Sequence, residues 1–222
     1  MRKFIVIVML VGLICVQFAS CSKIYNVGDV GPAGGYVFYD CDADNKSGNA
    51  DGLISTQCGW RYLEAAPEDL SYTNSSGYYS REYRFGYYRT SSSGSNSTVG
   101  TGTAIGTGKT NTEVLVKAMG ETTYRDSSGT VMVTYAAKEC DDYSVTKDGV
   151  IYNDWFLPSL DELILMYVNL HKQGLGSFAN IGYWSSSEFS YYAAWYQAFN
   201  TGYHCYILRD TGRYVRPIRA FK

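Results

Sequence analysis

The stretch PSLDELILMYVNLHK, residues 158–172, carries the clearest helix signal in this chain of 222 residues. Ser159 stands where a helix N-cap is expected, and Glu162, three residues later, completes a capping box. Gly174 follows the periodic pattern and predicts the end of the helix. The residues predicted to form its buried stripe are Leu160, Leu163, Met166, Tyr167 and Leu170. We therefore expect an amphipathic helix with one face in the core.

Strand-like segments lie on both sides of this helix. They are rich in aromatic residues, end at polar turns, and read GGYVFYD (34–40), GYWSSSE (182–188), AAWYQAF (193–199), GYHCYIL (202–208) and RYVRPIRAF (213–221). WRYLEAAPEDL (60–70) predicts a short buried segment, and residues 71–108 predict long irregular loops. This order of a strand, helices and a strand-rich C-terminal half predicts an α+β arrangement in one domain.

Two further helices are expected between these strands. The first covers Asn111–Met119, with Thr110 as its cap, Glu113 completing a capping box and Gly120 ending it. The second covers Val131–Cys140. Both would lie between the irregular region and the main helix.

The N-terminus resembles an export signal. A short basic segment, MRK, precedes an apolar run at residues 4–19 that is too short and badly flanked to be a stable membrane span. The run ends in FASC (18–21), which resembles a bacterial lipobox. We expect a signal peptide at 1–20, acylation of Cys21, a linker at 21–24 and a domain at 25–222, anchored by lipid at the outer membrane or cell surface. The alternative is an ordinary secretory signal with an incidental cysteine.

Export makes disulfide bonds feasible. Cys41 and Cys58 bracket the polar loop DADNKSGNADGLISTQ and are the expected disulfide pair, which would stabilise the fold by roughly 3 kcal/mol. Cys140 lies in an apolar context and is expected to be buried. The acidic residues Asp40, Asp42, Asp44 and Asp51 also suggest a calcium loop, but the spacing of a calcium-binding hand is not kept. A solvated loop closed by the disulfide is the preferred interpretation.

Several functional classes receive no support. The formal charge of -2 argues against a nucleic-acid partner. TGTAIGTGKTNTE (101–113) is not a phosphate-binding loop, because position 103 is threonine where the motif requires glycine. Metalloprotease, serine-hydrolase and paired-cysteine motifs are absent from the sequence, and the histidines are His171 and His204. We expect no enzyme and no cofactor.

The C-terminal stretch 187–214 holds six tyrosines among small polar residues and little charge. The simplest interpretation is a pair of strands, since tyrosine favours strands. The other is a binding surface, because rigid aromatic side chains among small polar residues are typical of binding loops. Trp155, Trp184 and Trp195 are expected in the core. Arg216 and Arg219 are expected to pair with carboxylates or carbonyls.

Taken in order, GPAGGYVFYD, WRYLEAAPEDL, TAIGTGKTNTE, DWFLPSLDELILMYVNL, GYWSSSE and YVRPIRAF resemble bacterial surface domains of the C-type lectin type, in the branch shared with formylglycine-generating enzyme. Within that branch, the chain is most similar to variable proteins diversified by a retroelement, and the similarity covers residues 25–222. The resemblance implies a C-terminal variable region at about 183–222, held by tryptophans and by a terminal strand that pairs with GGYVFYD.

In such proteins, mutation of adenines changes selected codons into other codons that end in a pyrimidine. Fourteen residues here are amino acids that such codons encode. The implied ligand-binding positions are Phe189, Ser190, Tyr191, Tyr192, Tyr196, Ala198, Tyr203, His204, Cys205, Tyr206, Leu208, Asp210, Thr211 and Tyr214. Glu188, Trp195 and Gln197 would be fixed framework. The tripeptides of calcium-dependent sugar-binding lectins are missing, so binding without a metal is implied.

The sequence therefore predicts a monomeric surface lipoprotein that binds an unidentified protein or glycan through a tyrosine-rich face. One alternative is an adhesin of fixed specificity for host glycan or matrix. A second alternative, ranked last, is an enzyme of the formylglycine-generating type, whose paired active-site cysteines have no counterpart here.

Overall fold

The computed structural model describes residues 23–43, 55–73, 77, 79–86, 97–120, 124–125, 131–132 and 134–222. The predicted signal peptide, Cys21 and most of the predicted loop between Cys41 and Cys58 lie outside these residues. The helices are α1 (Ser55–Cys58), α2 (Gly108–Met119), α3 (Ala136–Asp141), α4 (Leu160–Asn169) and the 3-10 turn η2 (His171–Gln173). None of the helices in the described residues is long and apolar enough to cross a bilayer.

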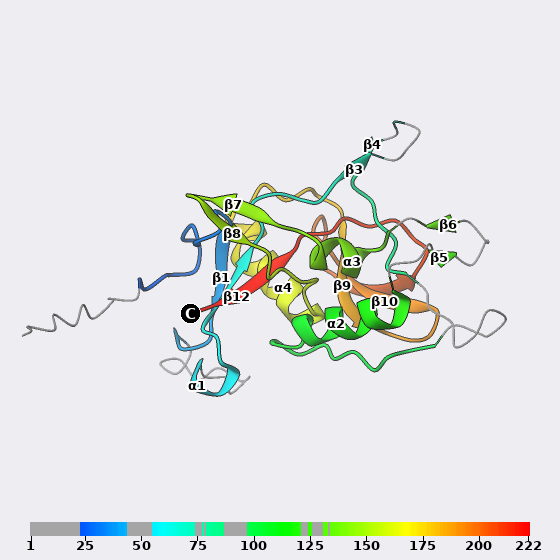
Figure 1. The fold of residues 1–222 in the computed structure, drawn as a ribbon, viewed down its shortest axis with the longest axis horizontal. Helices are drawn as coiled ribbons and strands as arrows, with labels where there is room; N and C mark the ends of the chain where they lie inside the picture. Colours follow the sequence, from blue (N-terminus) through cyan, green and yellow to red (C-terminus); the bar gives the residue numbers. More distant parts are fainter. Residues whose placement is uncertain are drawn as a thin grey trace, which may run out of the picture.

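The strands are short and pair antiparallel. They are β1 (Tyr36–Asp40), β2 (Tyr62–Ala65), β3 (Tyr72–Thr73), β4 (Tyr79–Ser80), β5 (Tyr124–Arg125), β6 (Val131–Met132), β7 (Val145–Lys147), β8 (Val150–Tyr152), β9 (Gly182–Glu188), β10 (Ala193–Ala198), β11 (His204–Leu208) and β12 (Ile218–Phe221). In the described part of the chain they form two three-stranded sheets, β1-β2-β12 and β11-β10-β9, and three two-stranded pairs. The predicted α+β class is confirmed (Figure 1).

The expected pairing of the terminal strand with residues 34–40 is wrong. Instead β2 lies between β1 and β12, with Ala65 opposite both Tyr36 and Ile218. All four residues of β2 are buried. A buried strand needs backbone partners on both edges, so β2 occupies the centre of the sheet and separates the two predicted partners.

Helix α4 has the predicted capping box. The Ser159 hydroxyl accepts from the Glu162 backbone N–H, and the Glu162 carboxylate accepts from the Ser159 N–H. The stripe is confirmed: Leu160, Leu163, Met166 and Leu170 are buried, and Tyr167 is half-buried. Gly174 ends the following turn in the left-handed conformation, at φ 73°.

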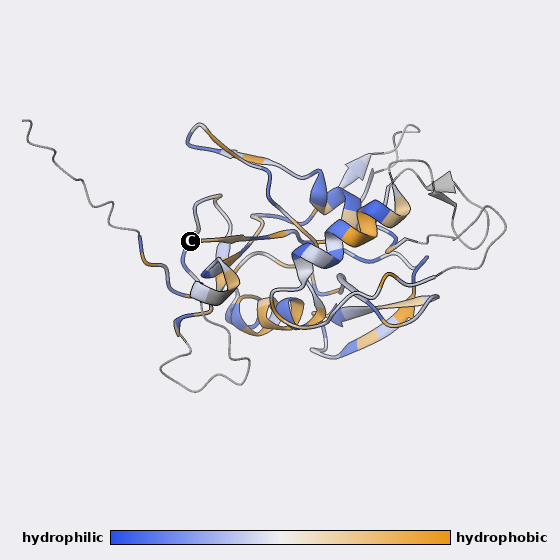
Figure 2. Ribbon diagram, turned by 60° about the horizontal axis from the view of Figure 1, so that its bottom comes forward, coloured by the Kyte–Doolittle hydropathy of each residue, from blue (hydrophilic) through white to orange (hydrophobic). Residues whose placement is uncertain are grey.

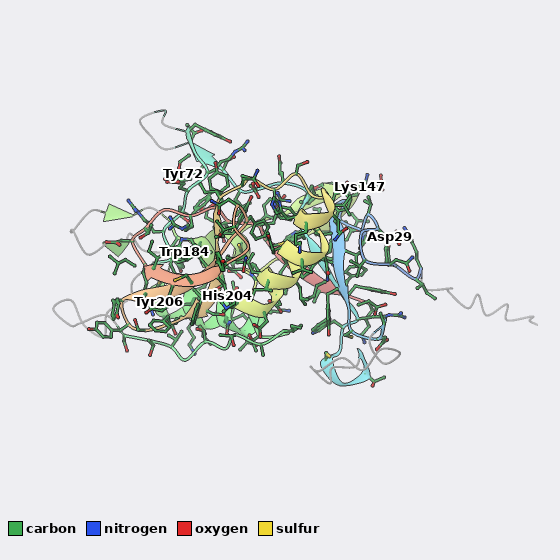
Figure 3. All side chains as sticks on the ribbon, turned by 180° about the vertical axis from the view of Figure 1, so that it is seen from behind. Asp29, Tyr72, Lys147, Trp184, His204 and Tyr206 are labelled. Carbon is green, nitrogen blue, oxygen red and sulfur yellow. The ribbon has the colours of Figure 1, made fainter. Side chains whose placement is uncertain are left out.

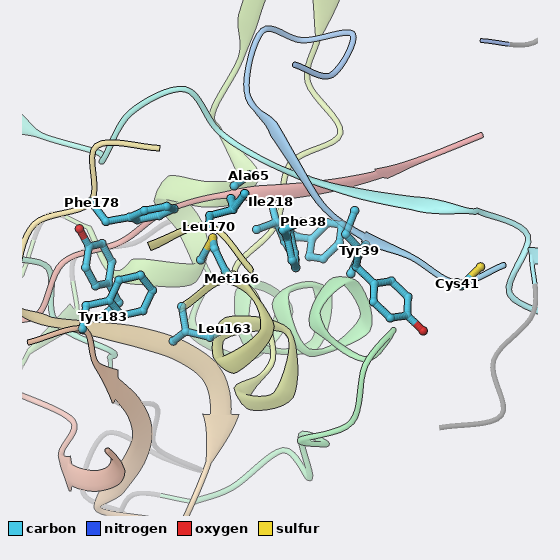
Figure 4. Packing of buried hydrophobic residues seen from close by; sticks show 13 residues of the cluster. Phe38, Tyr39, Cys41, Ala65, Leu163, Met166, Leu170, Phe178, Tyr183 and Ile218 are labelled. Carbon is cyan, nitrogen blue, oxygen red and sulfur yellow. The ribbon is translucent and has the colours of Figure 1, made fainter. Parts of the chain in front are cut away.

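One of the two main apolar clusters joins α4 to both three-stranded sheets. Leu163 and Met166 of α4, and Leu170 directly after it, pack with Phe38 of β1, Ile218 of β12 and Tyr183 of β9 (Figure 4). Figure 2 shows polar and apolar residues alternating along the helical ribbons, as amphipathic helices require. The main helix is therefore the element that fixes the two sheets relative to each other.

Two of the predicted helices begin elsewhere. Helix α2 starts at Gly108 rather than Asn111, and its N-cap is Thr107, which makes no side-chain capping bond. A Cβ on Gly108 would lie 2.2 Å from the Glu162 carboxylate, so the glycine allows the first turn of α2 to contact the start of α4. The predicted cap and box at Thr110 and Glu113 are wrong. The predicted end at Gly120 is confirmed.

The segment predicted as a helix from Val131 begins as a strand. Val131–Met132 form β6, which pairs with β5, and α3 starts only at Ala136. Tyr135 is extended, at φ -150° and ψ 162°, and the Ala136 N–H donates to the Arg84 carbonyl. This bond to a distant segment fixes the point at which the helix begins. Cys140 is buried as predicted.

Two buried arginines, one before β12 and one within it, contact distant parts of the domain. Arg216 Nε lies 2.7 Å from Asp69 Oδ1, and Arg216 Nη1 donates to the carbonyls of Ala66 and Gly176. Arg219 lies 2.8 Å from Asp154 and 3.3 Å from Glu64. The predicted pairing of both arginines with carboxylates or carbonyls is confirmed.

Candidate ligand-binding face

Strand β11 forms the outer edge of the C-terminal sheet within the described residues. Strand β9 is almost wholly buried, β10 is central, and four of the five residues of β11 are exposed. The register places Trp195 opposite Tyr206 and Gln197 opposite His204. Because side chains alternate along a strand, His204, Tyr206 and Leu208 share one face, and Cys205 and Ile207 share the other.

Four aromatic side chains contact one another on the outer side of this sheet. The rings of Phe189 and Tyr206 are stacked, with centroids 3.6 Å apart and planes 2° apart. Trp195 packs edge-on against both, at 5.3 and 5.6 Å, and lies 6.1 Å from His204. We call Phe189, Trp195, His204 and Tyr206 the aromatic face. Figure 3 shows His204 and Tyr206 on this sheet, with Trp184 further inside.

The aromatic face remains accessible although its members pack together. Phe189 is 43% exposed and Tyr206 is 44% exposed. Tyr191 and Tyr192, which lie in the turn before β10, and Tyr203, which lies in the turn before β11, are also exposed. Large, stiff side chains that are held by one another but open to solvent lose little conformational entropy when a ligand binds.

None of the fourteen predicted variable positions is buried. Eight are exposed, namely Phe189, Tyr191, Tyr192, Tyr203, His204, Cys205, Tyr206 and Leu208. The other six are half-buried, namely Ser190, Tyr196, Ala198, Asp210, Thr211 and Tyr214. The exposed set is therefore concentrated on β11 and on the two turns that flank β10.

Two of the half-buried tyrosines pack toward the interior. Tyr196 lies on the face of β10 opposite Trp195, where its ring is 6.5 Å from that of Trp184 and 4.8 Å from the Arg213 guanidinium. Tyr214 packs on Tyr183 at 5.8 Å and exchanges backbone hydrogen bonds with β9. Both tyrosines therefore help to hold the sheet on the core, although part of each side chain remains accessible.

The tryptophans differ from the prediction at one position. Trp184 is fully buried, and its indole N–H donates to the Tyr83 carbonyl at 2.9 Å, as a framework residue should. Trp155 is also buried. Trp195 is only half-buried, because the register turns it to the outer side of β10 beside Phe189 and Tyr206. It is a member of the aromatic face and not a core tryptophan.

The face is supported by a buried ion pair that the sequence does not predict. Arg209 follows β11, and its Nη2 lies 2.8 Å from Oε1 of Glu188 at the end of β9. Glu188 Oε2 also accepts from the backbone N–H groups of Val99 and Gly100. Glu188 thus ties one end of the sheet, where β9 ends and β11 ends, to a loop far away in the sequence. No local pattern distinguishes Arg209 from an exposed arginine.

The three serines of β9 also make framework contacts. Ser185 donates to the Trp195 carbonyl at 2.8 Å, and Ser187 donates to the Gly102 carbonyl at 2.8 Å while accepting from the Leu160 N–H. The Asn111 amide donates to the Ser186 hydroxyl at 3.1 Å. All three serines are fully buried. They fasten the inner strand to α2 and α4, so the outer strand is held on a rigid support.

Metal and catalytic groups do not converge on this face. The described residues contain no group of three or more His, Cys, Asp or Glu side chains that could hold a metal ion. Asp40, one of the suggested calcium ligands, receives two hydrogen bonds from Arg61. Asp44 and Asp51 lie outside the described residues. His171 packs among Tyr167, Phe178 and Phe199.

The predicted disulfide between Cys41 and Cys58 is not formed in this structure, where both residues are thiols. Burial and the neighbouring Cys58 raise the pKa of the Cys41 thiol to about 12. The disulfide therefore remains a prediction for the exported protein. Cys205 is an exposed thiol on the side of β11 opposite Tyr206.

Neither the family models nor the curated proteins compared with this sequence give a match.

Proposed function

We propose that this protein is a surface-displayed lipoprotein that binds ligands through the aromatic face and the exposed tyrosines beside it. The observation that carries the proposal is the exposed stack of Phe189 and Tyr206 against Trp195, on a sheet whose inner strand is fully packed. Aromatic anchors of this kind dominate binding energy at protein interfaces. Their ligand is a protein or glycan outside the cell.

The sheet has a buried inner strand, β9, and an exposed outer strand, β11. This arrangement favours a binding specificity that can vary. Glu188, Arg209 and the three serines of β9 fix the backbone through buried bonds. The exposed residues of β11 make few contacts with the interior, so they can change without loss of the fold. A retroelement that mutates their codons would thus alter the ligand and leave the scaffold intact. We propose a C-type lectin-like fold of the formylglycine-generating-enzyme branch as that scaffold.

Sequencing the gene in populations grown from single cells tests diversification. We expect adenine-directed changes confined to the fourteen named codons, together with a nearby reverse-transcriptase gene and a template repeat. Codons for Trp184, Glu188 and Gln197 should stay constant. An unchanging gene without a template repeat would instead favour an adhesin of fixed specificity.

A displayed library tests binding. Randomising Phe189, Tyr191, Tyr192, Tyr203, His204 and Tyr206 should give folded variants that bind unrelated test proteins. A matched library should change exposed side chains elsewhere, at Tyr79, Val150, Ile151 and Val168. We expect specific binders from the first library only, and binding that persists in EDTA. Equal yields from both libraries would contradict the proposed role of the face.

A further inference from the structure

Apart from Tyr79 and Val168, the large apolar side chains exposed in the described residues fall into two chemically different groups. Near the C-terminal sheet they are Phe189, Tyr191, Tyr192, Tyr203, Tyr206 and Leu208, which are mostly aromatic. A second group is aliphatic and consists of Ile24, Val27, Val30, Val150 and Ile151. Ile24 is 68% exposed and Ile151 is 66% exposed, so both offer most of their surface to a partner.

The aliphatic group comes from two segments that pack against each other. Residues 23–35 lead into β1, and β7 and β8 form a hairpin whose base joins the same small cluster, where Val145 and Tyr152 pack with Ala33 and Trp155. A Cβ on Gly34 would lie 3.7 Å from the Lys147 side chain, which places the hairpin directly beside the N-terminal segment. We call Ile24, Val27, Val30, Val150 and Ile151 the aliphatic pole.

The aliphatic pole and the aromatic face lie at opposite ends of the long axis. In Figure 3, Asp29 and Lys147 lie toward one end and Tyr206 toward the other. Figure 1 shows the N-terminal segment and the β7–β8 hairpin at the same end of the domain. A partner that covers the aliphatic pole would therefore leave the aromatic face free.

We propose that the aliphatic pole is a membrane-contacting surface that inserts shallowly into the bilayer and holds the aromatic face away from it. This inference rests on the proposed lipid anchor. Lys23 is two residues from Cys21, and two extended residues span at most about 7 Å. An acylated Cys21 would thus hold Ile24 at the lipid headgroups, because the chain before the domain is too short to let it float free.

The charges around the pole indicate the kind of lipid surface. Lys23, Lys147 and Lys222 lie in this part of the domain, but Asp29 and Asp148 offset them, and Asp148 lies 4.0 Å from Lys147. Long lysine side chains can extend to the headgroups while aliphatic residues enter the acyl region. Since the charges nearly cancel, we expect contact with zwitterionic as well as anionic lipid.

The test uses the acylated protein reconstituted in phosphatidylcholine vesicles, with or without bromine on the acyl chains. Bromine quenches a tryptophan only when the two are close. Ile151→Trp places a reporter on the pole, and Val168→Trp places a comparison reporter at an exposed residue of α4 that is not part of the pole. We expect the emission added by Ile151→Trp to be largely lost in brominated vesicles, and that of Val168→Trp to be retained. Adding Val150→Asp should restore the Ile151→Trp emission.

Each other outcome has a defined meaning. If the protein floats with the vesicles but both reporters escape quenching equally, the membrane contact is wrong and the anchor stands. If the wild-type protein does not float, the anchor and the contact are both wrong. Emission of Ile151→Trp that shifts with protein density but is not quenched would show that the pole binds a second copy of this chain, which would also overturn the proposal.

Discussion

Arg209 Nη2 lies 2.8 Å from Glu188 Oε1, and the two side chains are 0% and 3% exposed. The guanidinium also donates to the Ser190 carbonyl and lies over the Phe85 ring, 5.2 Å from its centroid. The pair therefore joins the end of β9, the turn that carries Phe189 and the segment after β11. Geometry at the aromatic face depends on this buried contact.

Replacement of Arg209 by methionine should be strongly destabilising. It leaves the Glu188 carboxylate buried beside an apolar side chain, and removal of one partner from a buried ion pair costs about 3–5 kcal/mol. Urea denaturation measures the change. Asp148→Asn is the matched control, because its pair with Lys147 is exposed and should contribute at most about 1 kcal/mol. Equal effects from the two variants would show that the buried pair does not support the sheet.

Substitutions on the aromatic face should cost less than those beneath it. Phe189→Ser with Tyr206→Ser removes one exposed stacked pair, whose loss costs on the order of 1–2 kcal/mol. Trp184→Ala removes a fully buried ring and should cost about 3–5 kcal/mol. Trp195→Ala should lie between these values because that ring is half-buried. Thermal unfolding checks the order, and a reversed order would mean that the exposed aromatics hold the core.

The buried carboxyl of Glu162 should make stability depend on pH. Burial raises its pKa from 4.5 to about 7, although the N–H groups of Ser159 and Gly106 donate to it. Between these values the unfolded chain releases a proton that the native state keeps. The contribution to stability is therefore complete below pH 4.5 and is lost as pH rises through 7, by on the order of 3 kcal/mol.

Urea titrations between pH 4.5 and 7.5 on Glu162→Gln check this sign. The variant should be less stable over the whole pH range, because the glutamine amide has one accepting oxygen where the carboxylate has two. Its stability should nevertheless fall less with pH than that of the wild type. Glu64, whose pKa is also raised by burial, contributes a slope of the same sign that should remain. A steeper fall in the variant would contradict the assignment.

The thiols should react in the order of their exposure. In the folded, reduced protein, Cys205 should be alkylated first, because it is exposed on an edge strand. Cys41 should react slowly, since its raised pKa leaves little thiolate, and Cys140 should be slowest, because burial also raises its pKa. Mass spectrometry after short exposure to iodoacetamide gives the order. Fast labelling of Cys140 would indicate that the cluster around α3 opens.

The exported protein, kept free of reductant, should contain the disulfide between Cys41 and Cys58. Peptide mapping without reductant should find the two cysteines in one linked fragment. Reduction should lower the free energy of unfolding by roughly 3 kcal/mol. Two unlinked peptides in the protein taken from membranes would show that the adjacent thiols stay reduced.

The sequence by itself determined the features that depend on neighbouring residues. Ser159 and Glu162 cap α4 through bonds within one turn, and Gly174 ends the 3-10 turn that follows α4 through its own backbone freedom. The bounds of β9 and the burial of Trp184 and Cys140 follow from local apolar patterns. Such interactions span a few residues, so their signals survive in the order of the amino acids alone.

Only the tertiary structure decided what depends on distant partners. The insertion of β2 between β1 and β12, the start of α3 at the Arg84 carbonyl and the ion pair of Glu188 with Arg209 all join segments far apart in the chain. Trp195 shows the same limit. Alternation along a strand fixes which side chains share a face, but only the packing of β10 against the core decides which face meets solvent.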